Sequence, residues 1–579
     1  MTLGLAERQG VLLDEVTRHC DEALPQDSVY ALLHRERDHL FPDELFADLY
    51  TTQGRRSVPP SVVATVMVLQ KLSGCSDREA ADRFTYDVRW RYAAGVGGWE
   101  ADQRWSLAHT VLVDMRARLR ASDDPKRVFR AVKQVAAEAG LIGARRVLDS
   151  APLYDAVATQ DTVTLIRSAV RGLLRACPPG LAAEIRQALA RDDDYATAGK
   201  PVCDWDDAEA RARLVDELVR DGMAALAVLE HRELPSGVAE AAELLATVVG
   251  QDVEEGEDGI FRIARRIATD RVISTVDPDA RHGRKTSSRC FDGYKGHIAL
   301  DPDSEIVTET AAGPANGGDA EMTERLLGDL APPADPADSD PADSDPADAC
   351  APDLEAAHAT GDAQGAGPDT PDADAAVVGP DSVAGRDGES DPPAVYGDAA
   401  YGSGESLALL EQLGARAMTK VQPPVAPGGR FAKDQFTIDL DAANVTCPAG
   451  HTVGLRPVGD SGGIASFGGL CDGCPLRQGC TSSAKGRSVR VGPHERLLAA
   501  ARAEQRDPGW QADYRATRPK VERKLAHLLR RRHGGRKART RGTERVDQDW
   551  SWNGLAYNIA RLAALGVRKT SHGWVAASA

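Results

Sequence analysis

Residues 331–392 form an acidic segment that constrains the folding of this chain more than any other feature. The segment contains 16 Asp and Glu residues against one basic residue, Arg386, and repeats the pattern Asp-Pro-Ala-Asp-Ser from Asp335 onward. Because it has almost no large apolar side chains, it cannot offset the entropy of ordering, and we predict that it is disordered. Its simplest interpretation is a tolerated loop insertion, although its acidity would also suit a solubilising segment or a mimic of DNA. The segment interrupts the predicted α/β layer, which has strands on both sides of it.

The net charge of −18 at pH 7 is concentrated in this segment. The segment has a net charge of −15, which leaves −3 for the rest of the chain. Residues 506–545, by contrast, contain 14 Lys and Arg residues against 4 acidic residues, a net charge of +10. A protein that is acidic overall can still carry a strongly basic face. The charge balance therefore does not exclude a nucleic-acid partner.

The length of 579 residues suggests three or four domains at about 150 residues each. Hydrophobic residues make up 42% and charged residues 27%, which is typical of globular proteins. No apolar run approaches the roughly 18 residues needed to span a bilayer, and the N-terminus lacks a secretory signal. We therefore expect a cytoplasmic protein with no membrane partner. In a reducing cytoplasm, the ten cysteines favour metal ligands or buried thiols over disulfides.

The first part of the chain, residues 1–125, has the pattern of an all-α domain. Pro60 is placed at a helix start, Gly74 marks a turn, and Ser76 with Glu79 forms a capping-box sequence. These signals predict a helix–turn–helix arrangement, a shape used to bind DNA, although most helical hairpins bind none. On this pattern alone, DNA contact is the less favoured of the two interpretations.

The pattern of the central part predicts an α/β layer with crossover connections. The expected strands are 145–149, 293–300, 305–310, 394–398 and 415–421, with helices over 319–330 and 403–413. A charged helical insertion, about 160–267, lies between the first two strands.

Three acidic residues are singled out by their positions. Asp149 and Asp398 each end a predicted strand, and acids at strand ends of an open α/β sheet meet where sites form. Glu522 lies on a basic helix that can pack across that edge. The alternatives that the sequence leaves open are Asp155 or Asp161 for the first acid, Asp292 or Asp301 for the second, and Glu544 for the third.

The helix that carries Glu522 has a buried face and a polar stripe. The buried face follows i, i+4, i+7, i+8 spacing through Val521, Leu525, Leu528 and Leu529. Glu522 borders this face and shares a stripe with Tyr514 and Arg518, each four residues apart. Pro519 favours a helix start at that point, which would place 514–518 in a preceding turn.

Three carboxylates in one place suit phosphodiester cleavage. The attacking and leaving oxygens both develop negative charge, and two Mg²⁺ ions about 3.5–4 Å apart stabilise both. Hard divalent cations prefer carboxylate oxygens as ligands. Three carboxylates hold such ions while leaving positions open for water and phosphate.

Four motifs together resemble the DDE-type transposases of bacterial insertion sequences, over about residues 30–570 without the acidic segment. They are Val-Leu-Asp-Ser (147–150), Gly-Tyr-Lys-Gly-His (293–297), Tyr-Gly-Asp-Ala-Ala-Tyr-Gly (396–402) and Arg-Pro-Lys-Val-Glu-Arg-Lys (518–524). Each motif alone is weak, and their order makes the match specific. The Tyr–Arg–Glu–Lys signature of the family is only partly met, because Arg518 is one residue further from Tyr514 than expected and no Lys stands at the expected place after Glu522.

The resemblance implies a ribonuclease-H-like catalytic core, a mixed sheet with helices, behind the all-α domain and interrupted by insertions. It implies Asp149, Asp398 and Glu522 as the catalytic and metal-binding triad, with Mg²⁺ or Mn²⁺ as the cofactor. The expected activity is cleavage at insertion-sequence ends and strand transfer into target DNA. The expected partners are double-stranded DNA of both kinds and, because two ends need two sites, a second copy in a homodimer. The protein would then be associated with the nucleoid.

The expected division of the chain follows from these assignments. We expect a helical DNA-binding domain (1–125), the first part of the catalytic core with its insertion (140–330), the acidic insert (331–392), the second part of the core (393–422), a cysteine-containing insertion (423–500) and a C-terminal helical part of the core with the basic run (501–579).

The cysteine-containing insertion holds a candidate structural zinc site. Cys471 and Cys474 are separated by two residues, a spacing that lets both thiolates face one metal. Cys447 and Cys480 would complete a tetrahedral set, and His451 could replace one thiol. The alternative is a group of reduced cysteines that bind no metal.

The basic run predicts contacts with the DNA backbone. Such contacts give salt-dependent affinity with little sequence readout. The residues that we assign to DNA binding are Arg518, Lys520, Arg523, Lys524, Arg530, Arg531, Arg532, Arg536 and Lys537. A solvated charged surface is the alternative.

Two other functions remain open from the sequence. A nuclease of the same fold would cut without joining, since hydrolysis and strand transfer use one site. A catalytically inactive DNA-binding protein derived from a transposase is the second alternative.

Overall fold

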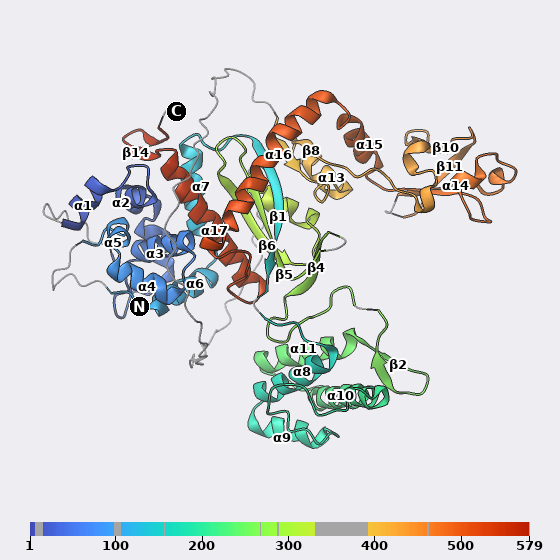
Figure 1. Cartoon of the computed structure of the whole chain (residues 1–579), viewed down its shortest axis with the longest axis horizontal. Coiled ribbons are helices and arrows are strands. Elements are labelled where there is room, and N and C mark those ends of the chain that lie inside the picture. The colour runs from blue at the N-terminus through green and yellow to red at the C-terminus, as the bar shows by residue number, and fades with distance from the viewer. Residues whose placement is uncertain are drawn as a thin grey trace. The chain divides into compact units, whose positions relative to one another are not determined.

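The computed structural model describes most of the chain outside the acidic segment (Figure 1). The described residues are 1–5, 15–97, 106–155, 157–266, 268–286, 289–330, 392–459 and 462–577. The disorder predicted for residues 331–392 lies outside the described residues, except at Pro392.

A six-stranded mixed sheet joins segments from both sides of the acidic segment. Its strands are β1 (Arg145–Tyr154), β4 (Arg281–Thr286), β5 (Arg289–Leu300), β6 (Val307–Pro314), β7 (Ala394–Gly397) and β8 (Arg416–Thr419). The strand order is β4–β5–β1–β7–β8, and β6 also pairs with β5. The pairs among β4, β5, β6 and β1 are antiparallel, whereas β7 pairs in parallel with both β1 and β8.

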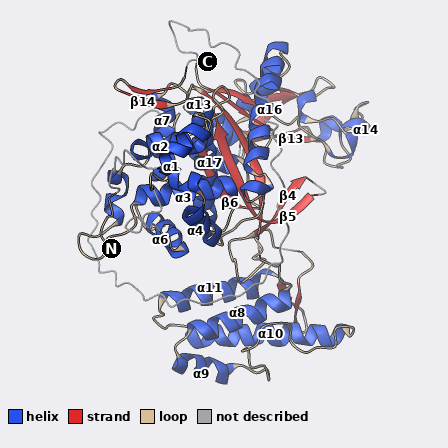
Figure 2. Cartoon of the chain, turned by 60° about the vertical axis from the view of Figure 1, so that its left-hand side comes forward, coloured by secondary structure: helices blue, strands red, loops and turns tan. Residues whose placement is uncertain are grey.

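Helices cover both faces of this sheet, as the colouring by secondary structure makes visible (Figure 2). Alternate residues of β1 belong to different hydrophobic clusters, because successive side chains of a strand point to opposite faces. Val147 packs in the cluster that contains residues of α16 (Pro508–Leu528) and α17 (Thr543–Ala564). Leu148 packs in the cluster that contains residues of α12 (Thr323–Leu326) and α13 (Gly404–Gln412).

Helix α17 is held on the sheet by polar contacts as well as by apolar packing. The indole Nε1 of Trp550 donates a hydrogen bond to the carbonyl of His297 at 2.9 Å. The amide of Asn558 both donates to and accepts from the backbone of Val307, at 2.8 Å each. A Cβ on Gly296 would lie 2.8 Å from the Trp550 ring, so only glycine allows this close approach of helix and strand.

The N-terminal region is helical in its described residues, as predicted. Its helices are α1 (Glu15–Ala23), α2 (Val29–Leu40), η1 (Asp43–Leu49), α3 (Pro60–Ser73), α4 (Asp77–Tyr86), α5 (Val88–Ala93), α6 (His109–Arg120) and α7 (Arg127–Glu138). The turn at Gly74 has a positive φ of 60°, and the capping box of Ser76 and Glu79 is present.

Helix α3 is buried at every position from Pro60 to Lys71. It packs against α17, α2, α4 and α6. A helix that is buried all round cannot enter a DNA groove, so the hairpin does not present α3 to DNA. Helix α4 keeps an exposed face that includes Arg78 and Arg83.

The predicted helical insertion forms a bundle with its own hydrophobic cluster. It consists of α8 (Thr162–Ala176), α9 (Pro179–Ala188), α10 (Ala208–Leu229), α11 (Ser236–Gln251) and the short hairpin of β2 (Val253–Glu255) and β3 (Phe261–Ile263).

The cysteine-containing region forms a separate five-stranded antiparallel sheet in the order β13–β12–β11–β10–β9. Its elements are η4 (Pro427–Gly429), η5 (Lys433–Gln435), β9 (Thr437–Asp439), β10 (Asn444–Thr446), β11 (Thr452–Pro457), β12 (Gly463–Ser466), η6 (Gly468–Cys471), α14 (Arg477–Cys480) and β13 (Ser488–Val491). The remaining elements are η3 (Ala320–Met322), α15 (Glu495–Glu504), η7 (Arg531–His533), β14 (Arg568–Thr570) and β15 (Gly573–Val575).

Several elements differ from their predicted bounds, among them β5 and β6, which are Arg289–Leu300 and Val307–Pro314 against the predicted 293–300 and 305–310. Strand β1 continues past Asp149 to Tyr154, because its second half pairs with β5. The helix predicted over 319–330 is limited to η3 and α12. Helix α16 begins at Pro508 and runs through Pro519, which lies inside the helix and not at its start.

No helix of the described residues has both the length and the apolar character needed to cross a membrane.

Candidate active site

The register of the two central parallel strands places Asp149 and Asp398 side by side. Val147 of β1 pairs with Tyr396 of β7. Continuing this register by two residues brings Asp149 opposite Asp398, the residue that follows β7. Neighbouring strands lie about 4.8 Å apart, so the fold itself brings the two carboxylates together.

Helix α16 crosses the same edge and adds the third acid. The hydroxyl of Tyr514 donates to the carbonyl of Gly397, next to Asp398, at 3.1 Å. One turn later lies Arg518, and one further turn brings Glu522. The stripe predicted from the i, i+4 spacing therefore faces the sheet.

Arg518 contacts all three acids. Its Nη2 lies 3.0 Å from Oδ1 of Asp149 and 3.9 Å from Oδ2 of Asp398. Its Nη1 lies 3.5 Å from Oε1 of Glu522. The Arg518 side chain is only 6% exposed, whereas the carboxylates of Asp398 and Glu522 are 49% and 63% exposed. The cluster thus has a buried cation and two acids open to solvent.

Burial and charge act in opposite directions on the central pair. Burial raises the pKa of Asp149, and the charge of Arg518 opposes this effect without cancelling it. Burial also disfavours the charged form of Arg518, but Asp149 and Asp398 outweigh it, so the pKa of Arg518 is raised. Asp149 therefore depends on a neighbouring positive charge to stay ionised.

Asp319 is a further acid at this site that the sequence analysis did not assign. Its carboxylate accepts a hydrogen bond from Ser150 Oγ at 2.6 Å and pairs with Lys295 at 2.8 Å. Burial alone would raise its pKa, but His297, Lys295 and Ser150 outweigh that effect and lower it. Ser150 links this pair to Asp149, its neighbour in β1. The signal for Asp319 was its place just after β6, which had been interpreted only as a helix start.

The acids line one cavity of about 750 Å³. Its wall also carries basic side chains, namely Arg284, Lys285, Lys295 and Arg536. A cavity that combines a group of carboxylates with a basic wall suits a phosphate chain, because the cations attract the phosphates toward the acids.

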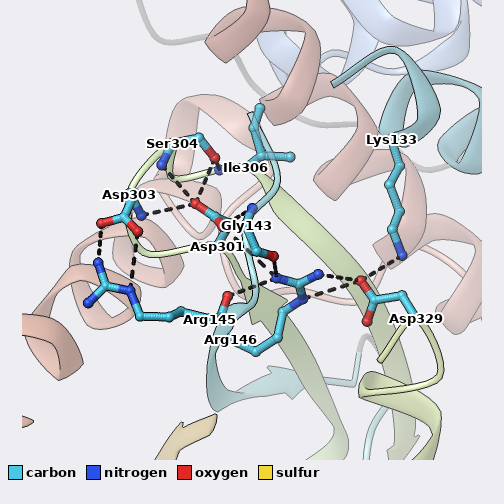
Figure 3. A network of polar contacts seen from close by, with 9 residues as sticks. All are labelled: Lys133, Gly143, Arg145, Arg146, Asp301, Asp303, Ser304, Ile306 and Asp329. Carbon is cyan, nitrogen blue, oxygen red and sulfur yellow. Dashed lines mark hydrogen bonds and ion pairs between the residues drawn. The ribbon is translucent and has the colours of Figure 1, made fainter. Parts of the chain in front are cut away.

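Asp301, the alternative to Asp398 as the second acid, holds a turn of the sheet instead (Figure 3). Its buried carboxylate accepts from the backbone N–H groups of Gly143, Asp303 and Ser304 at 2.9, 3.0 and 2.8 Å. These bonds hold the turn between β5 and β6 against the start of β1. Asp301 does not line the cavity of the three acids.

A second part of the same network fixes Arg146, next to the start of β1 (Figure 3). Its Nη2 lies 2.9 Å from Asp329, which also pairs with Lys133 of α7 at 3.1 Å. The guanidinium donates to the carbonyls of Gly143 and Arg145 at 2.7 and 2.8 Å. The network therefore anchors the strand that carries Asp149.

The other acids that the sequence leaves open as alternatives lie outside the cavity, and three of them form hydrogen bonds or ion pairs elsewhere. Asp161 caps α8 and pairs with Lys200. Asp155 accepts from the N–H of Val157, and Asp292 accepts from Thr159. The cavity wall includes none of Asp155, Asp161, Asp292 and Glu544.

Comparison with known families gives two matches. Residues 446–563 match a family described as Transposase DDE domain, and residues 18–118 match a family described as Transposase domain (DUF772). The two matches support a DDE-type transposase of an insertion sequence. The first match contains Arg518 and Glu522, whereas Asp149 and Asp398 lie outside both. No curated protein and no solved structure matches the transposase. The family indicates a function in transposition, an activity on phosphodiester bonds and DNA as a partner.

Apart from Arg518, which lies among the acids, the predicted DNA-binding residues divide into two groups. On α16, Lys520 lies 3.9 Å from Asp303, and both Arg523 and Lys524 pair with Glu305, at 3.7 and 2.5 Å. These cations are partly neutralised within the chain. The second group follows α16. Its exposed members are Arg530, Arg531, Arg532 and Lys537, and Arg536 lies in the cavity wall.

The basic run is attached to the α3–α4 turn. The ring of His533 bonds through Nδ1 with the carbonyl of Leu72 at 2.8 Å, and Arg539 donates to the carbonyl of Cys75 at 2.9 Å. A Cβ on Gly74 would lie 2.2 Å from the carbonyl oxygen of Arg532. The N-terminal helices thus position the basic run next to the acids.

Transposases of this family generally use divalent metal ions. The donor chemistry of Asp149, Asp398 and Glu522 fits such an ion, because hard cations are held by carboxylate oxygens. As the side chains lie, no three His, Cys, Asp or Glu residues in the described part of the chain are arranged to hold one ion. Arg518 supplies the positive charge around which the acids gather.

The four predicted zinc ligands lie around one small cavity of about 20 Å³, which His451 also lines. Cys471 and Cys480 are buried, and Cys447 and Cys474 are partly exposed. Burial raises the pKa of Cys480, and the other three thiols add to this effect. The fold thus gathers the four thiols from distant positions, although not in ligating geometry.

Proposed function

We propose that the transposase cuts DNA at the ends of its element and joins the freed 3′ hydroxyl to target DNA, with Asp149, Asp398 and Glu522 as its catalytic acids. The observation that carries this proposal is the convergence of the three carboxylates within 3.9 Å of one guanidinium, from two parallel strands and one crossing helix. The three acids line one cavity of about 750 Å³, whose wall also carries basic side chains.

A ribonuclease-H-like core is part of the proposal. Strands β6, β5 and β1 are antiparallel neighbours, and β7 and β8 follow β1 in parallel. This arrangement supports such a sheet, with the first acid on its central strand and the second after the neighbouring strand.

Residues of the chain position the DNA backbone and the attacking water. Lys295 and Arg536 attract the DNA backbone to the cavity wall. Arg518 lies where it can approach a phosphate oxygen while it remains paired with Asp149. The attacking water must lose a proton, and the exposed carboxylates of Asp398 and Glu522 can accept it.

Mg²⁺ or Mn²⁺ is the proposed cofactor, held by Asp149, Asp398 and Glu522. When bound, it supplies positive charge that stabilises the attacking and leaving oxygens. Cys447, Cys471, Cys474 and Cys480 are the proposed ligands of a structural Zn²⁺, a role in folding and not in the reaction.

DNA binding by the N-terminal helices (1–125) and by the basic run is proposed as well, with a homodimer in the DNA complex. The exposed face of α4 and the residues 530–537 are the surfaces that support it. We also propose the division into domains that the sequence predicts.

The proposed function is tested by mixing the purified protein with a labelled fragment that carries both element ends. We expect metal-dependent cleavage at the 3′ ends and joined products in Mg²⁺, and neither in EDTA. Cleavage without joined products in Mg²⁺ would replace the transposase activity with that of a nuclease.

A further inference from the structure

A cleft of about 340 Å³ adjoins the cavity of the three acids. The two share Pro152, Lys285, Phe291 and Arg536 in their walls. The cleft is additionally lined by Tyr154 and Arg289, and we call it the Tyr154 cleft. Its volume lies within the range of about 300–1,000 Å³ that is usual for ligand pockets.

An exposed aromatic ring forms one wall of the Tyr154 cleft. Tyr154 is the last residue of β1, on the same strand as Asp149, and 43% of it is exposed. The buried ring of Phe291 meets the Tyr154 ring edge-on, with centroids 6.2 Å apart and an angle of 83°. A ring that is exposed and also braced offers a stacking surface for a nucleobase.

The basic run reaches the same place through its backbone. The N–H of Tyr154 donates to the carbonyl of Arg536 at 2.7 Å, and the N–H of Ala538 donates to the carbonyl of Tyr154 at 2.8 Å. The segment thereby lies along the end of β1. This attachment places the Arg536 side chain in the walls of both cavities.

Three cations around the two cavities have no acidic partner within the described residues. These are Arg284, Lys285 and Arg536, which take part in no ion pair there, in contrast to Lys520 and Lys524 on α16. Cations without a partner beside a cavity attract phosphate groups more strongly than neutralised ones do.

The combination of a stacking ring with cations suits a single DNA strand. In a duplex the base faces are covered by their neighbours, so only an unstacked base can lie on the Tyr154 ring. Any of the four bases can stack on an aromatic ring, and the cations bind the phosphates of the backbone.

We propose that the Tyr154 cleft binds a short single-stranded stretch of DNA beside the scissile phosphate, with one unpaired base stacked on Tyr154. The phosphates next to that base lie against Lys285 and Arg536. This inference rests on the proposed function and names the form of DNA that the site takes.

The test is a binding measurement in EDTA with the full-length protein. The probes are a labelled duplex with a short single-stranded overhang that contains 2-aminopurine, and the same duplex with blunt ends. We expect the wild-type protein to prefer the overhang by about 10-fold, the size of one base–aromatic stack, and to quench the 2-aminopurine fluorescence. Tyr154→Ala loses the preference and the quenching, and Tyr154→Phe keeps both.

The control is Trp205→Ala, because Trp205 is an exposed aromatic residue between α9 and α10 of the helical insertion, 37% exposed and outside the cleft. It should behave as the wild type. The inference is overturned if Tyr154→Ala keeps the preference, or if Tyr154→Phe loses it. If Tyr154→Ala does not fold, Lys285→Gln tests the cleft instead. The inference requires that this variant weaken binding of the overhang duplex several-fold more than binding of the blunt duplex.

Failure of this inference is distinguishable from failure of the proposed function. Binding in EDTA needs no catalysis, whereas the cleavage assay in Mg²⁺ reads the activity. A protein that cuts and joins but shows no role for Tyr154 contradicts the inference alone. A protein that binds the overhang through Tyr154 but never cuts contradicts the proposed function alone.

Discussion

The guanidinium of Arg518 lies 3.0 Å from the carboxylate of Asp149, and this ion pair organises the acidic cluster. The side chain of Asp149 is only 13% exposed, so its charge needs a nearby cation. Arg518 is the cation in this structure, and a divalent metal ion would compete with it for the same oxygens. The relationship between the two residues therefore couples stability, ionisation and metal binding at one site.

Arg518→Ala should destabilise the protein by about 3 kcal/mol, because it leaves the carboxylate of Asp149 buried without a partner. Added Mg²⁺ should stabilise this variant more than the wild type, since the ion takes over the missing charge. Urea unfolding in EDTA and in Mg²⁺ measures both effects. Arg515→Ala is the matched control, because Arg515 is exposed on the same helix. Equal stabilisation of Arg518→Ala and wild type by Mg²⁺ would contradict the account.

Stability should fall as the pH is lowered from about 6.5 to 4, the window set by His527. Burial lowers the pKa of His527 to about 4, and Arg530 adds to the effect, whereas an unfolded His titrates near 6.5. The unfolded chain then binds more protons in this window, so folding loses stability as pH falls. His533, Arg532 and Lys524 act in the same direction on His527.

His527→Gln should flatten this dependence in unfolding experiments run across the window. His231→Gln serves as the control, because the side chain of His231 is 90% exposed. An unchanged slope in His527→Gln would show that other groups dominate acid destabilisation.

Gly74→Ala should both destabilise the fold and weaken DNA binding. The residue has a φ of 60°, and a Cβ there would meet the carbonyl oxygen of Arg532 at 2.2 Å, which displaces the basic run. Gly140→Ala is the matched control, because Gly140 has a φ of 71° but nothing within 4 Å of its Cβ. The control should cost only the strain of the left-handed conformation, about 1 kcal/mol. Thermal unfolding and DNA titration compare the two, and equal losses would argue against the contact.

Purified transposase should contain one zinc ion per chain if the four thiols hold a metal. Cys471→Ser combined with Cys474→Ser removes two of the thiols and should abolish the zinc content. Cys290→Ser, an exposed cysteine in β5, is the control and should leave it unchanged. Elemental analysis of the three proteins decides the matter. A wild-type protein without zinc that is as stable as one refolded with zinc would exclude a structural site.

The sequence predicts the elements that carry the candidate acids, because strand and helix patterns are local signals. Asp398 follows β7 as expected, whereas Asp149 lies inside β1 and not at its end, and the parallel register of β1 with β7 brings the two residues together. The apolar sequence of α3 also carried its own signal, since a helix that is apolar all round is buried.

Partners that are distant in the sequence were not predictable. Arg518 is a predicted DNA-binding residue, and the sequence does not show that its neighbours on β1 and after β7 also place it at the centre of the acidic cluster. Lys524 was assigned to DNA as well, and Glu305 in the turn before β6 neutralises it. Local patterns show the charge of a side chain, whereas only the fold shows which charges meet.

The central claim is tested most directly by strand transfer with Asp398→Asn. The substitution removes one carboxylate that is half exposed, so the fold should be unaffected, and Glu544→Gln on α17 is the control with an acid outside the cavity. The account predicts that Asp398→Asn binds the labelled element ends as the wild type does but forms no joined product in Mg²⁺, while Glu544→Gln joins normally. Joining by Asp398→Asn at the wild-type rate would contradict the assignment of the three acids.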